Sequence, residues 1–493
     1  MQVEHRGRCI RRTARHTLAE RATGSDGAAM HRLIIRAEWT IVHTQGRQVP
    51  VEGVCIVVED GRVADLTKVP PSDGDTIEVP GGIAFPGFIN LHNHTINGPL
   101  FRGIVDDLPR KAIGESKVYS MLMPMGALAV SHLDPDELEA LVALGLLEYA
   151  RSGATTLVDQ FRPRQTAILE LAKQWGLRLY AAPYLFSPAG VIGDPSVARA
   201  AQGSFEGETG LSTFEELFAR FDEGERGRVR VILGPHAADS CAPDLLKAVD
   251  RIARERGLIA TIHLAQSQGE VDRVRAERGL DPAGYMDSVG LLREGVIFAH
   301  GVHLTGDELA RVRASGATIA HCASVFLRGG KAPTFARFAE HSVRFGIGTD
   351  AERMDMLSQL RASGFASKQA TGAGDAGTAA GLFHAATIVG AEALRRPDLG
   401  RIECGATADI VIVDAGKPHL QPINDPIRTL VWYASSADVD TVVVNGRPIV
   451  RGGRLSGLDE QAIIRRGAAA TRRVWDEARL RGHFPVEAAP ARA

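Results

Sequence analysis

Apolar and polar positions along the chain alternate in two distinct patterns. Over residues 30–85, short β-branched runs such as Leu33–Ile35 and Val54–Val58 are broken by Gly, Asp and Pro, which is typical of hairpin strands. The same pattern returns near the C-terminus, in Ala408–Asp414 and Thr441–Val444. We therefore predict one composite β-sandwich built from residues 30–85 together with residues 397–455.

The long middle region, residues 86–396, instead alternates apolar strands with amphipathic helices. A helix predicted over Pro135–Ser152 carries Leu, Ala and Glu at a spacing of three to four residues. The predicted strands are Pro86–His94, Ala154–Val158, Leu179–Ala182, Val229–Leu233, Ile259–His263, Val296–His300, Ala317–His321 and Val343–Gly348. Eight strand–helix units predict an α/β fold, a (β/α)8 TIM barrel, with its chemistry at the carboxyl ends of the strands. A doubly wound sheet is the alternative, but no Gly-rich phosphate loop follows the first strand.

The two ends of the chain are predicted to lie outside both units. Residues 1–29 contain six Arg and lack the apolar stretch of a secretory signal, so we expect a disordered extension. Residues 456–493 are predicted to form a C-terminal helix over Asp459–Arg479, followed by a tail.

Composition narrows the class of protein and of partner. The chain has 493 residues, of which 44% are hydrophobic and 24% charged, which indicates a globular protein with a large core. Its 57 Lys and Arg balance 59 Asp and Glu, for a formal net charge of −2, which argues against nucleic acid or an anionic membrane as partner. No apolar run reaches the roughly 18 to 20 residues that cross a bilayer. Five scattered Cys without CxxC spacing argue against a disulfide scaffold and favour a cytoplasmic location.

Polar residues end the predicted strands, and most of them are histidines. In a strand, residues i and i+2 point to the same side, so the first strand presents two imidazoles together. The residues that end or follow the strands are His92, His94, His236, His263, His300, His321 and Asp350. Because closing a barrel brings these ends to one mouth, and because imidazole and carboxylate bind Zn²⁺ or Fe²⁺, we predict a metal site there. Of this set, His321 is interpreted as a structural residue at the rim. A cation in such a site lowers the pKa of bound water to about 7 and so supplies hydroxide.

The motifs around these positions resemble a known superfamily. The segments PGFINLHNH, GATTLVD, GPHAADSC, IHLAQS, AHGVHL, AHCAS and GIGTDA occur in this order. Together they resemble the amidohydrolase superfamily, and within it the cytosine-deaminase-like branch that includes the triazine hydrolases. The C-terminal segments GATADIVIVDA and VVVNGRPIV are similar to the returning β-strands of that branch, so the resemblance covers about residues 32 to 455.

This resemblance implies a cofactor, partners and residue roles. One divalent cation, with Zn²⁺ first and Fe²⁺, Mn²⁺ or Co²⁺ as alternatives, would be held by four residues: His92, His94, His263 and Asp350. Asp350 would also transfer the proton of the attacking hydroxide to the leaving group. His300 would polarise the substrate or bond the water, and His236 would contact the substrate. The resemblance further implies a small-molecule substrate and a homo-oligomer.

One position departs from the pattern of the superfamily. The ring deaminases of this branch have a proton-carrying glutamate three residues after the fifth strand's histidine, where this chain has Gln266. Because an amide cannot ionise, we expect hydrolysis of a C–N bond in a neutral amide, urea or (thio)carbamate, as in xenobiotic degradation. Gln266 would then act in catalysis and substrate binding, and the apolar Phe326, which replaces a polar residue of relatives, would also contact substrate.

Two alternatives remain open. The first is a deaminase or dechlorinase of an N-heterocycle such as a triazine, pterin or purine, in which Gln266 only orients the ring or Glu270 supplies the carboxylate. The second is a catalytically silent binding protein.

Overall fold

The computed structural model describes residues 32–104, 118–162, 165–187, 209–331, 335–351 and 353–482. The extension predicted over residues 1–29 lies outside the described residues, as does the end of the predicted C-terminal tail.

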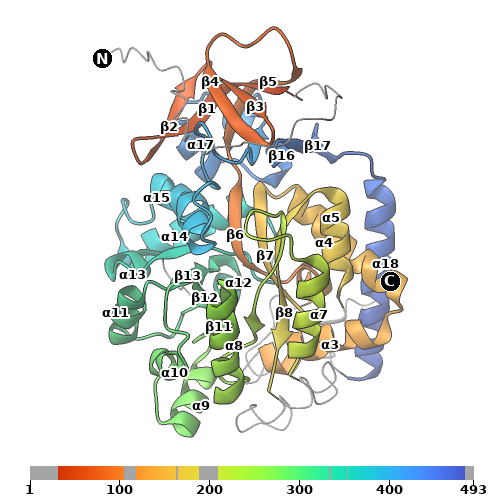
Figure 1. Ribbon diagram of the computed structural model, residues 1–493, viewed down its shortest axis with the longest axis vertical. Helices are drawn as coiled ribbons and strands as arrows, with labels where there is room; N and C mark the ends of the chain where they lie inside the picture. The colour runs from red at the N-terminus through yellow and green to blue at the C-terminus, as the bar shows by residue number, and fades with distance from the viewer. Residues whose placement is uncertain are drawn as a thin grey trace, which may run out of the picture.

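A nine-stranded sheet lies at one end of the molecule and contains strands from both ends of the described chain (Figure 1). Its order is β18-β17-β16-β15-β5-β1-β3-β4, and β2 pairs with β1. The strands are β1 (Arg32–Thr44), β2 (Arg47–Glu52), β3 (Cys55–Glu59), β4 (Arg62–Thr67), β5 (Asp75–Pro86), β15 (Ile410–Val413), β16 (Val439–Val444), β17 (Arg447–Arg451) and β18 (Arg454–Leu455). The N- and C-terminal segments thus share one sheet. A β-sandwich would also need two packed layers, which strand pairing alone does not establish.

Strand β15 joins the two halves of this sheet and is buried on both faces. It pairs antiparallel with β5 on one side and with β16 on the other. Ile410 and Ile412 pack into a smaller cluster made mostly of residues from this sheet, whereas Val411 and Val413 pack into the main core. A continuous apolar run is the pattern expected of a strand covered on both sides.

The middle of the chain forms shorter strands that all run parallel. They are β6 (Phe88–Asn93), β7 (Ala154–Phe161), β8 (Arg178–Leu185), β9 (Val229–Val231), β10 (Gly234–Pro235), β11 (Ala260–Leu264), β12 (Val296–His300), β13 (Thr318–His321) and β14 (Phe345–Ile347). The strand predicted over Val229–Leu233 is observed as the shorter β9, and β10 begins directly after the predicted range; both pair with β8.

The parallel strands form two sheets, and isolated parallel bridges connect these sheets to each other. One sheet runs β10-β8-β7-β6 and the other runs β11-β12-β13-β14. An isolated parallel bridge between Leu233 and Ala260 links the sheets at one edge, and a bridge between Asn93 and Asp350 links them at the other. Since every pairing is parallel, the carboxyl ends of all these strands lie on the same side.

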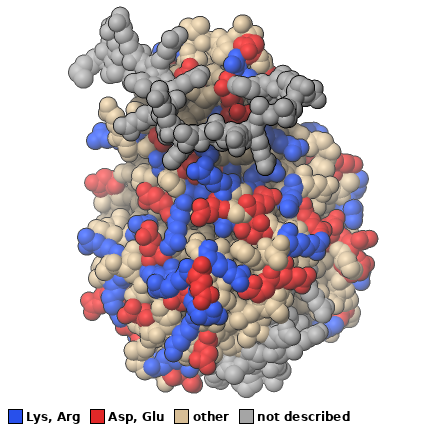
Figure 2. Space-filling model, in the orientation of Figure 1, with Lys and Arg blue, Asp and Glu red and all other residues tan. Residues whose placement is uncertain are grey.

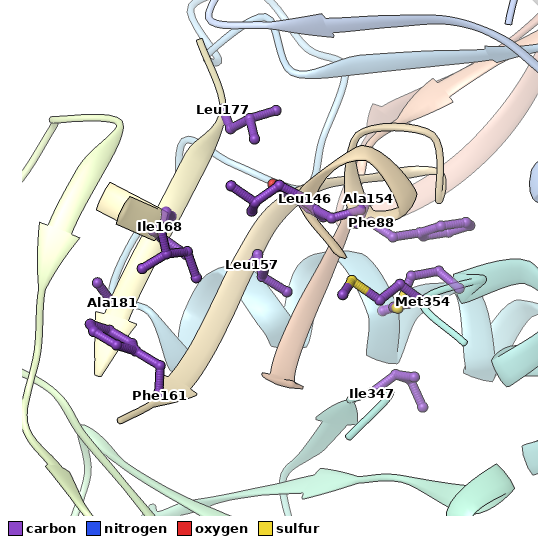
Figure 3. Packing of buried hydrophobic residues seen from close by; sticks show 14 of the residues in the cluster. Phe88, Leu146, Ala154, Leu157, Phe161, Ile168, Leu177, Ala181, Ile347 and Met354 are labelled. Carbon is purple, nitrogen blue, oxygen red and sulfur yellow. The ribbon is translucent and has the colours of Figure 1, made fainter. Parts of the chain in front are cut away.

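Alternate residues of the parallel strands pack in two different places. Val158 of β7 and Tyr180 of β8 belong to a small cluster to which seven of the parallel strands or their flanking residues contribute. The neighbouring residues Leu157 and Phe161 of β7 belong to the main core, where they pack with Ile168 of a covering helix (Figure 3). One face of each strand is thus turned to the other strands and the opposite face to the helices.

Helices follow most of the parallel strands and cover them (Figure 1). Those of five or more residues are α1 (Asn97–Phe101), α3 (Met123–His132), α4 (Pro135–Ala150), α5 (Ala167–Trp175), α7 (Leu211–Phe221), α8 (Pro243–Arg256), α9 (Gln268–Arg278), α10 (Pro282–Ser288), α11 (Gly306–Ser315), α12 (Ala323–Arg328), α13 (Phe335–Glu340), α14 (Met356–Thr371), α15 (Ala379–His384), α17 (Pro426–Trp432) and α18 (Glu460–Leu480). A four-residue helix, α16 (Gly390–Ala393), follows a π-helical turn, η2 (Ala385–Val389), and a second π-helical turn, η1 (Val118–Leu122), precedes α3.

The C-terminal helix α18 lies along the side of the molecule, against α4 and α3 (Figure 1). The indole Nε1 of Trp475 donates a hydrogen bond to the Leu100 carbonyl oxygen at 2.7 Å. Gly467 allows the close approach, because a Cβ there would lie 2.8 Å from the Ala140 carbonyl oxygen of α4.

Acidic and basic side chains are interspersed over the face that Figure 2 shows. Among the described helices, none combines the length and the apolarity that crossing a bilayer requires.

Candidate metal centre

Five side chains meet at the carboxyl ends of the parallel strands. His92 belongs to β6 and His94 follows it, His263 and His300 belong to β11 and β12, and Asp350 follows β14. The four histidines are each at most 6% exposed. Nitrogen atoms of His92, His94 and His263 lie within 4.8 Å of one another, and so do ligand atoms of His92, His300 and Asp350.

The contact between His94 and His263 shows what this cluster is suited to bind. Nδ1 of His94 lies 2.8 Å from the Gln160 carbonyl oxygen, and Nδ1 of His263 lies 2.6 Å from the His236 carbonyl oxygen. A carbonyl oxygen only accepts, so each Nδ1 carries the proton and each Nε2 has a free lone pair. The two Nε2 atoms lie 3.3 Å apart, a repulsive arrangement that a cation shared between them relieves.

His92 and Asp350 complete this donor set. Both ring nitrogens of His92 are buried and have no hydrogen-bond partner among the described residues, although a buried polar atom normally has one. Oδ1 of Asp350 lies 3.4 Å from Nε2 of His94 and 3.8 Å from Nε2 of His92. A set of three imidazoles and one carboxylate around a common point fits one zinc-type cation.

His300 lies on the other side of the carboxylate. Its Nε2 is 3.8 Å from Oδ2 of Asp350. Both residues have left-handed backbone conformations, with φ of 83° at His300 and 57° at Asp350. Such conformations strain non-glycine residues and cluster at functional sites, where the surrounding structure holds them.

Burial keeps the imidazoles of the site neutral. It lowers the pKa of His94 and of His263 to about 4, and it lowers the pKa of His92, His236 and His300 well below the ordinary histidine value. The neighbouring imidazoles disfavour the charged form further. Neutral imidazole is the form that binds a metal ion.

A hydrogen-bond network behind the site fixes the first and last strands. Asn90 and Asn93 of β6 bond the Thr349 hydroxyl at 2.7 and 2.9 Å. Asp159 of β7 accepts hydrogen bonds from Asn93 and from the backbone and hydroxyl of Thr95. These bonds position the backbone on both sides of His94 and next to Asp350.

His236 stands beside the cluster in an aromatic environment. Its ring stacks on Phe186 with centroids 4.4 Å apart, and the ring of Tyr184 packs edge-on at 5.1 Å. Nδ1 of His236 lies 2.7 Å from the Ser240 hydroxyl. Phe326 of α12 packs against His300, with ring centroids 5.0 Å apart.

Gln266 and Glu270 play different parts in the structure. Nε2 of Gln266 is buried and has no hydrogen-bond partner in the described part of the chain. The carboxylate of Glu270 accepts hydrogen bonds from the backbone N–H groups of Ala265 and Gln266, at 2.8 and 2.9 Å. Glu270 therefore fixes the turn that carries Gln266, and its two oxygens are already used for that purpose.

Sequence reasoning misses two residues near the cluster. The Tyr184 hydroxyl, near the end of β8, lies 3.0 Å from Nδ1 of His94. Arg162, directly after β7, is only 3% exposed, and its charge contributes to the low pKa of His94 and His236. Tyr184 and Arg162, like the histidines, are polar residues at the carboxyl end of an apolar strand. They are missed because the strands predicted from the sequence end before these two positions.

Comparison with known proteins identifies the family and its relatives. The sequence model described as the amidohydrolase family matches residues 83–449. A 5-methylthioadenosine/S-adenosylhomocysteine deaminase of Moorella thermoacetica is 33% identical over 452 residues, 88% of this chain and 97% of that protein. A 5'-deoxyadenosine deaminase of Methanothermobacter thermautotrophicus is 31% identical over 423 residues, 84% of this chain and 93% of that protein.

Solved structures show the same fold. An adenosine deaminase from Xanthomonas campestris with bound zinc is 23% identical and superposes with a TM-score of 0.77, covering 90% of this chain and 98% of that chain. An atrazine chlorohydrolase of Arthrobacter aurescens, complexed with zinc, is 24% identical with a TM-score of 0.77, covering 89% of this chain and all of that chain.

Proposed function

The chain belongs to the amidohydrolase family, and from this we propose that it is a metal-dependent aminohydrolase that removes an amino group from an N-heterocycle and releases ammonia. The observation that carries this proposal is the convergence of His92, His94, His263 and Asp350 on one point, in a chain whose relatives are named as nucleoside deaminases. The sequence-based expectation of a urea, amide or carbamate substrate depends mainly on Gln266. We therefore replace it with the alternative considered there, deamination of an N-heterocycle. Similarity along most of the chain carries more information than one position.

The cation would be held by His92, His94, His263 and Asp350, with zinc as the first candidate. His94 and His263 would bind through Nε2, because each Nδ1 is occupied by a backbone carbonyl. A divalent ion in such a site lowers the pKa of bound water and supplies hydroxide at neutral pH.

Asp350 and His300 would carry the proton and polarise the substrate. The two oxygens of Asp350 lie near different partners, Oδ1 near His94 and Oδ2 near His300. The carboxylate can accept a proton from the attacking water and release it to the departing amine, so one water is consumed for each ammonia released. A neutral His300 next to Asp350 can donate a hydrogen bond to the oxygen that forms on the ring.

Gln266 would hold the heterocycle through its free amide group. An amide N–H donates to a ring nitrogen but cannot transfer a proton, so proton transfer falls to Asp350. Glu270 would act through Gln266, by holding its backbone, and not on the substrate.

The proposed function comes with a proposed domain architecture. The parallel strands would close into a (β/α)8 barrel over residues 86–396, and the unit over residues 30–85 and 397–455 would be a β-sandwich beside it. The bridges at both edges of the two parallel sheets and the solved structures of similar fold support the closed barrel. A cytoplasmic location and a homo-oligomeric state stay predictions from the sequence.

The test is release of ammonia by the zinc-loaded full-length protein. The substrates are 5'-deoxyadenosine, 5-methylthioadenosine, S-adenosylhomocysteine, a pterin and a triazine, with a phenylurea and a thiocarbamate as the competing class. We expect ammonia from at least one heterocycle and no amine from the phenylurea or thiocarbamate. Amine release from those two compounds, without ammonia from any heterocycle, overturns the proposal.

The matched control is Asp350→Asn, which keeps the size of the side chain and removes its charge. We expect kcat to fall by about 10³-fold or more, since general acid–base catalysis alone contributes about 10²–10⁴. Zinc content and circular dichroism show whether the variant still binds metal and folds. Near-normal turnover in Asp350→Asn contradicts the role assigned to this carboxylate.

A further inference from the structure

Arg162 is a buried cation beside the candidate metal centre, and the described part of the chain gives it no carboxylate partner. Its side chain is 3% exposed, and no ion pair with an acidic residue is found for it in that part of the chain. Nη2 donates to the Met123 carbonyl oxygen at 2.8 Å, whereas Nε is buried and has no partner among the described residues. A charge taken out of water without a counter-charge costs several kcal/mol, so such a group is normally paired.

Arg162 lies on the same side of β7 as residues that face the other strands. Val158 packs in the cluster between the parallel strands, and the Gln160 amide donates to the Thr261 carbonyl oxygen of β11 at 2.9 Å. Because alternate residues of a strand share a face, Arg162 continues this row at the carboxyl end of β7. That is the end at which His94 and His263 meet.

The guanidinium is fixed between a helix and an aromatic ring. Its Cζ lies 5.9 Å from the centroid of the Tyr184 ring, and the Tyr184 hydroxyl in turn lies 3.0 Å from Nδ1 of His94. On the other side it packs against Gly126 of α3, where a Cβ would come within 2.4 Å of Nη1. A guanidinium fixed in this way is preorganised for a planar anion.

The nearest acidic residue of the strand does not neutralise it. Asp159 uses Oδ2 to accept hydrogen bonds from Asn93 and Thr95. Burial raises the pKa of Asp159 to about 7, and Arg162 is not among the groups that lower it. The positive charge next to His94 therefore remains uncompensated by Asp159.

We propose that Arg162 binds a carboxylate carried by the substrate, so that the enzyme acts on an N-heterocycle with an anionic substituent close to the reacting carbon. This inference rests on the proposed function, because it assumes that the bound molecule is a substrate. Binding itself can be measured without turnover. The carboxylate would pair with the guanidinium through the free donors of Arg162, while the ring lies toward His236 and Gln266.

The test compares two ligands of nearly the same shape, the anionic 4-aminopyrimidine-5-carboxylate and the neutral 4-aminopyrimidine-5-carboxamide. Their binding to the zinc-loaded full-length protein is measured by isothermal titration calorimetry. We expect the wild type to prefer the carboxylate by about tenfold or more, as charge-assisted bonds are roughly twice as strong as neutral ones. Arg162→Met should weaken carboxylate binding by about 10- to 100-fold and change carboxamide binding less than about threefold.

Two further variants separate recognition from a structural role of Arg162. Arg162→Lys keeps the charge but not the planar fork and should retain part of the preference. Gly126→Ala places a methyl group against the guanidinium and should displace it, which weakens carboxylate binding without removing a charge. Arg251→Met, at an exposed arginine paired with Glu255 on the same helix, is the control for lost net charge and should leave both ligands unaffected.

The outcomes are distinct from those of the function test. If Arg162→Met and Gly126→Ala bind both ligands with the wild-type ratio, or if the wild type shows no preference, the inference is wrong. If the preference depends on Arg162 but no heterocycle yields ammonia, the proposed deamination fails and the anion site stands. Should Arg162→Met misfold, the ligand ratios of Arg162→Lys and Gly126→Ala still distinguish a carboxylate site from its absence.

Discussion

An imidazole binds a metal ion only through an unprotonated nitrogen, so the pKa of each histidine decides the pH range in which the site can be loaded. Burial lowers the pKa of His94 and His263 to about 4, and it lowers the pKa of His92 well below its ordinary value. The direction of these shifts means that the metal-free site takes up protons only in acid. Exposed histidines, with a pKa of about 6.5, already compete with the metal at pH 6.

We therefore expect zinc affinity to change less than about threefold between pH 8 and pH 6, and to fall steeply below about pH 5. Competition with a chelator of known pH dependence measures it. The same titration on His263→Asn should show weaker binding at every pH, because one ligand is lost. A tenfold loss of wild-type affinity between pH 7 and pH 6 contradicts the inference that burial keeps these imidazoles neutral.

Gln266 offers a second test on a single side chain. Gln266→Glu should raise kcat/KM for the best heterocycle of the panel by about 10- to 100-fold, because a carboxyl group can transfer the proton that an amide cannot. Gln266→Ala is the matched control and should lower it, since it removes the donor without adding an acid. Equal rates for the Glu and Gln forms show that proton transfer at this position does not limit the reaction.

On the scale of strands and helices, the sequence pattern locates eight of the nine parallel strands of the middle region, missing β10, and shortens some of the others. Strand β7 is predicted to end at Val158, because Asp159 and Gln160 are polar and polarity usually marks exposure. Both are fully buried and bonded, Asp159 to Thr95 and Gln160 to the Thr261 carbonyl oxygen. A pattern of apolar and polar residues cannot reveal partners that come from other strands.

Partners contributed by distant parts of the chain also explain which site residues the sequence does not reveal. The histidines are predictable because imidazoles at several strand ends point to a metal, whereas Arg162 follows a strand that continues three residues beyond its predicted end at Val158. The role of Glu270 is equally hidden, because only the structure shows both of its oxygens on backbone N–H groups. Gln266 is interpreted from the sequence as a departure from the pattern of the superfamily, but one amide is too little to decide the class of substrate.

The contact between α4 and the segment after β6 gives a prediction for a helix–strand interface. A Cβ at Gly145 would lie 2.2 Å from the Thr95 carbonyl oxygen. Gly145→Ala should therefore lower the free energy of unfolding by about 1–3 kcal/mol, although Ala is the better helix former. Since Thr95 follows His94, zinc affinity should fall too.

The control for this change is Gly374→Ala, at a position where a Cβ would meet nothing within 4 Å. Urea unfolding of the zinc-loaded variants gives both free energies. Gly374→Ala should stay within about 0.5 kcal/mol of the wild type. Equal stability of the two variants means that α4 can move away from Thr95 without cost.

On the scale of the whole molecule, one buried ion pair ties the nine-stranded sheet to the parallel strands. Arg178 begins β8, and Asp409 directly precedes β15. The pair is bidentate at 2.8 and 3.0 Å, with side chains 0% and 2% exposed. Asp409 also accepts a hydrogen bond from the backbone N–H of Asn445 at 2.7 Å. The carboxylate is thus shared by the two parts of the molecule.

Asp409→Asn should destabilise the protein by about 3–5 kcal/mol, because it leaves the buried guanidinium of Arg178 without a counter-charge. Glu255→Gln, in an exposed pair with Arg251, should cost at most about 1 kcal/mol. Replacing both partners, with Arg178→Met and Asp409→Leu, should recover much of the loss, because no buried charge then remains unpaired. Urea unfolding followed by tryptophan fluorescence measures all three. If Asp409→Asn is no more destabilising than Glu255→Gln, this ion pair does not hold the sheet to the strands that carry the metal centre.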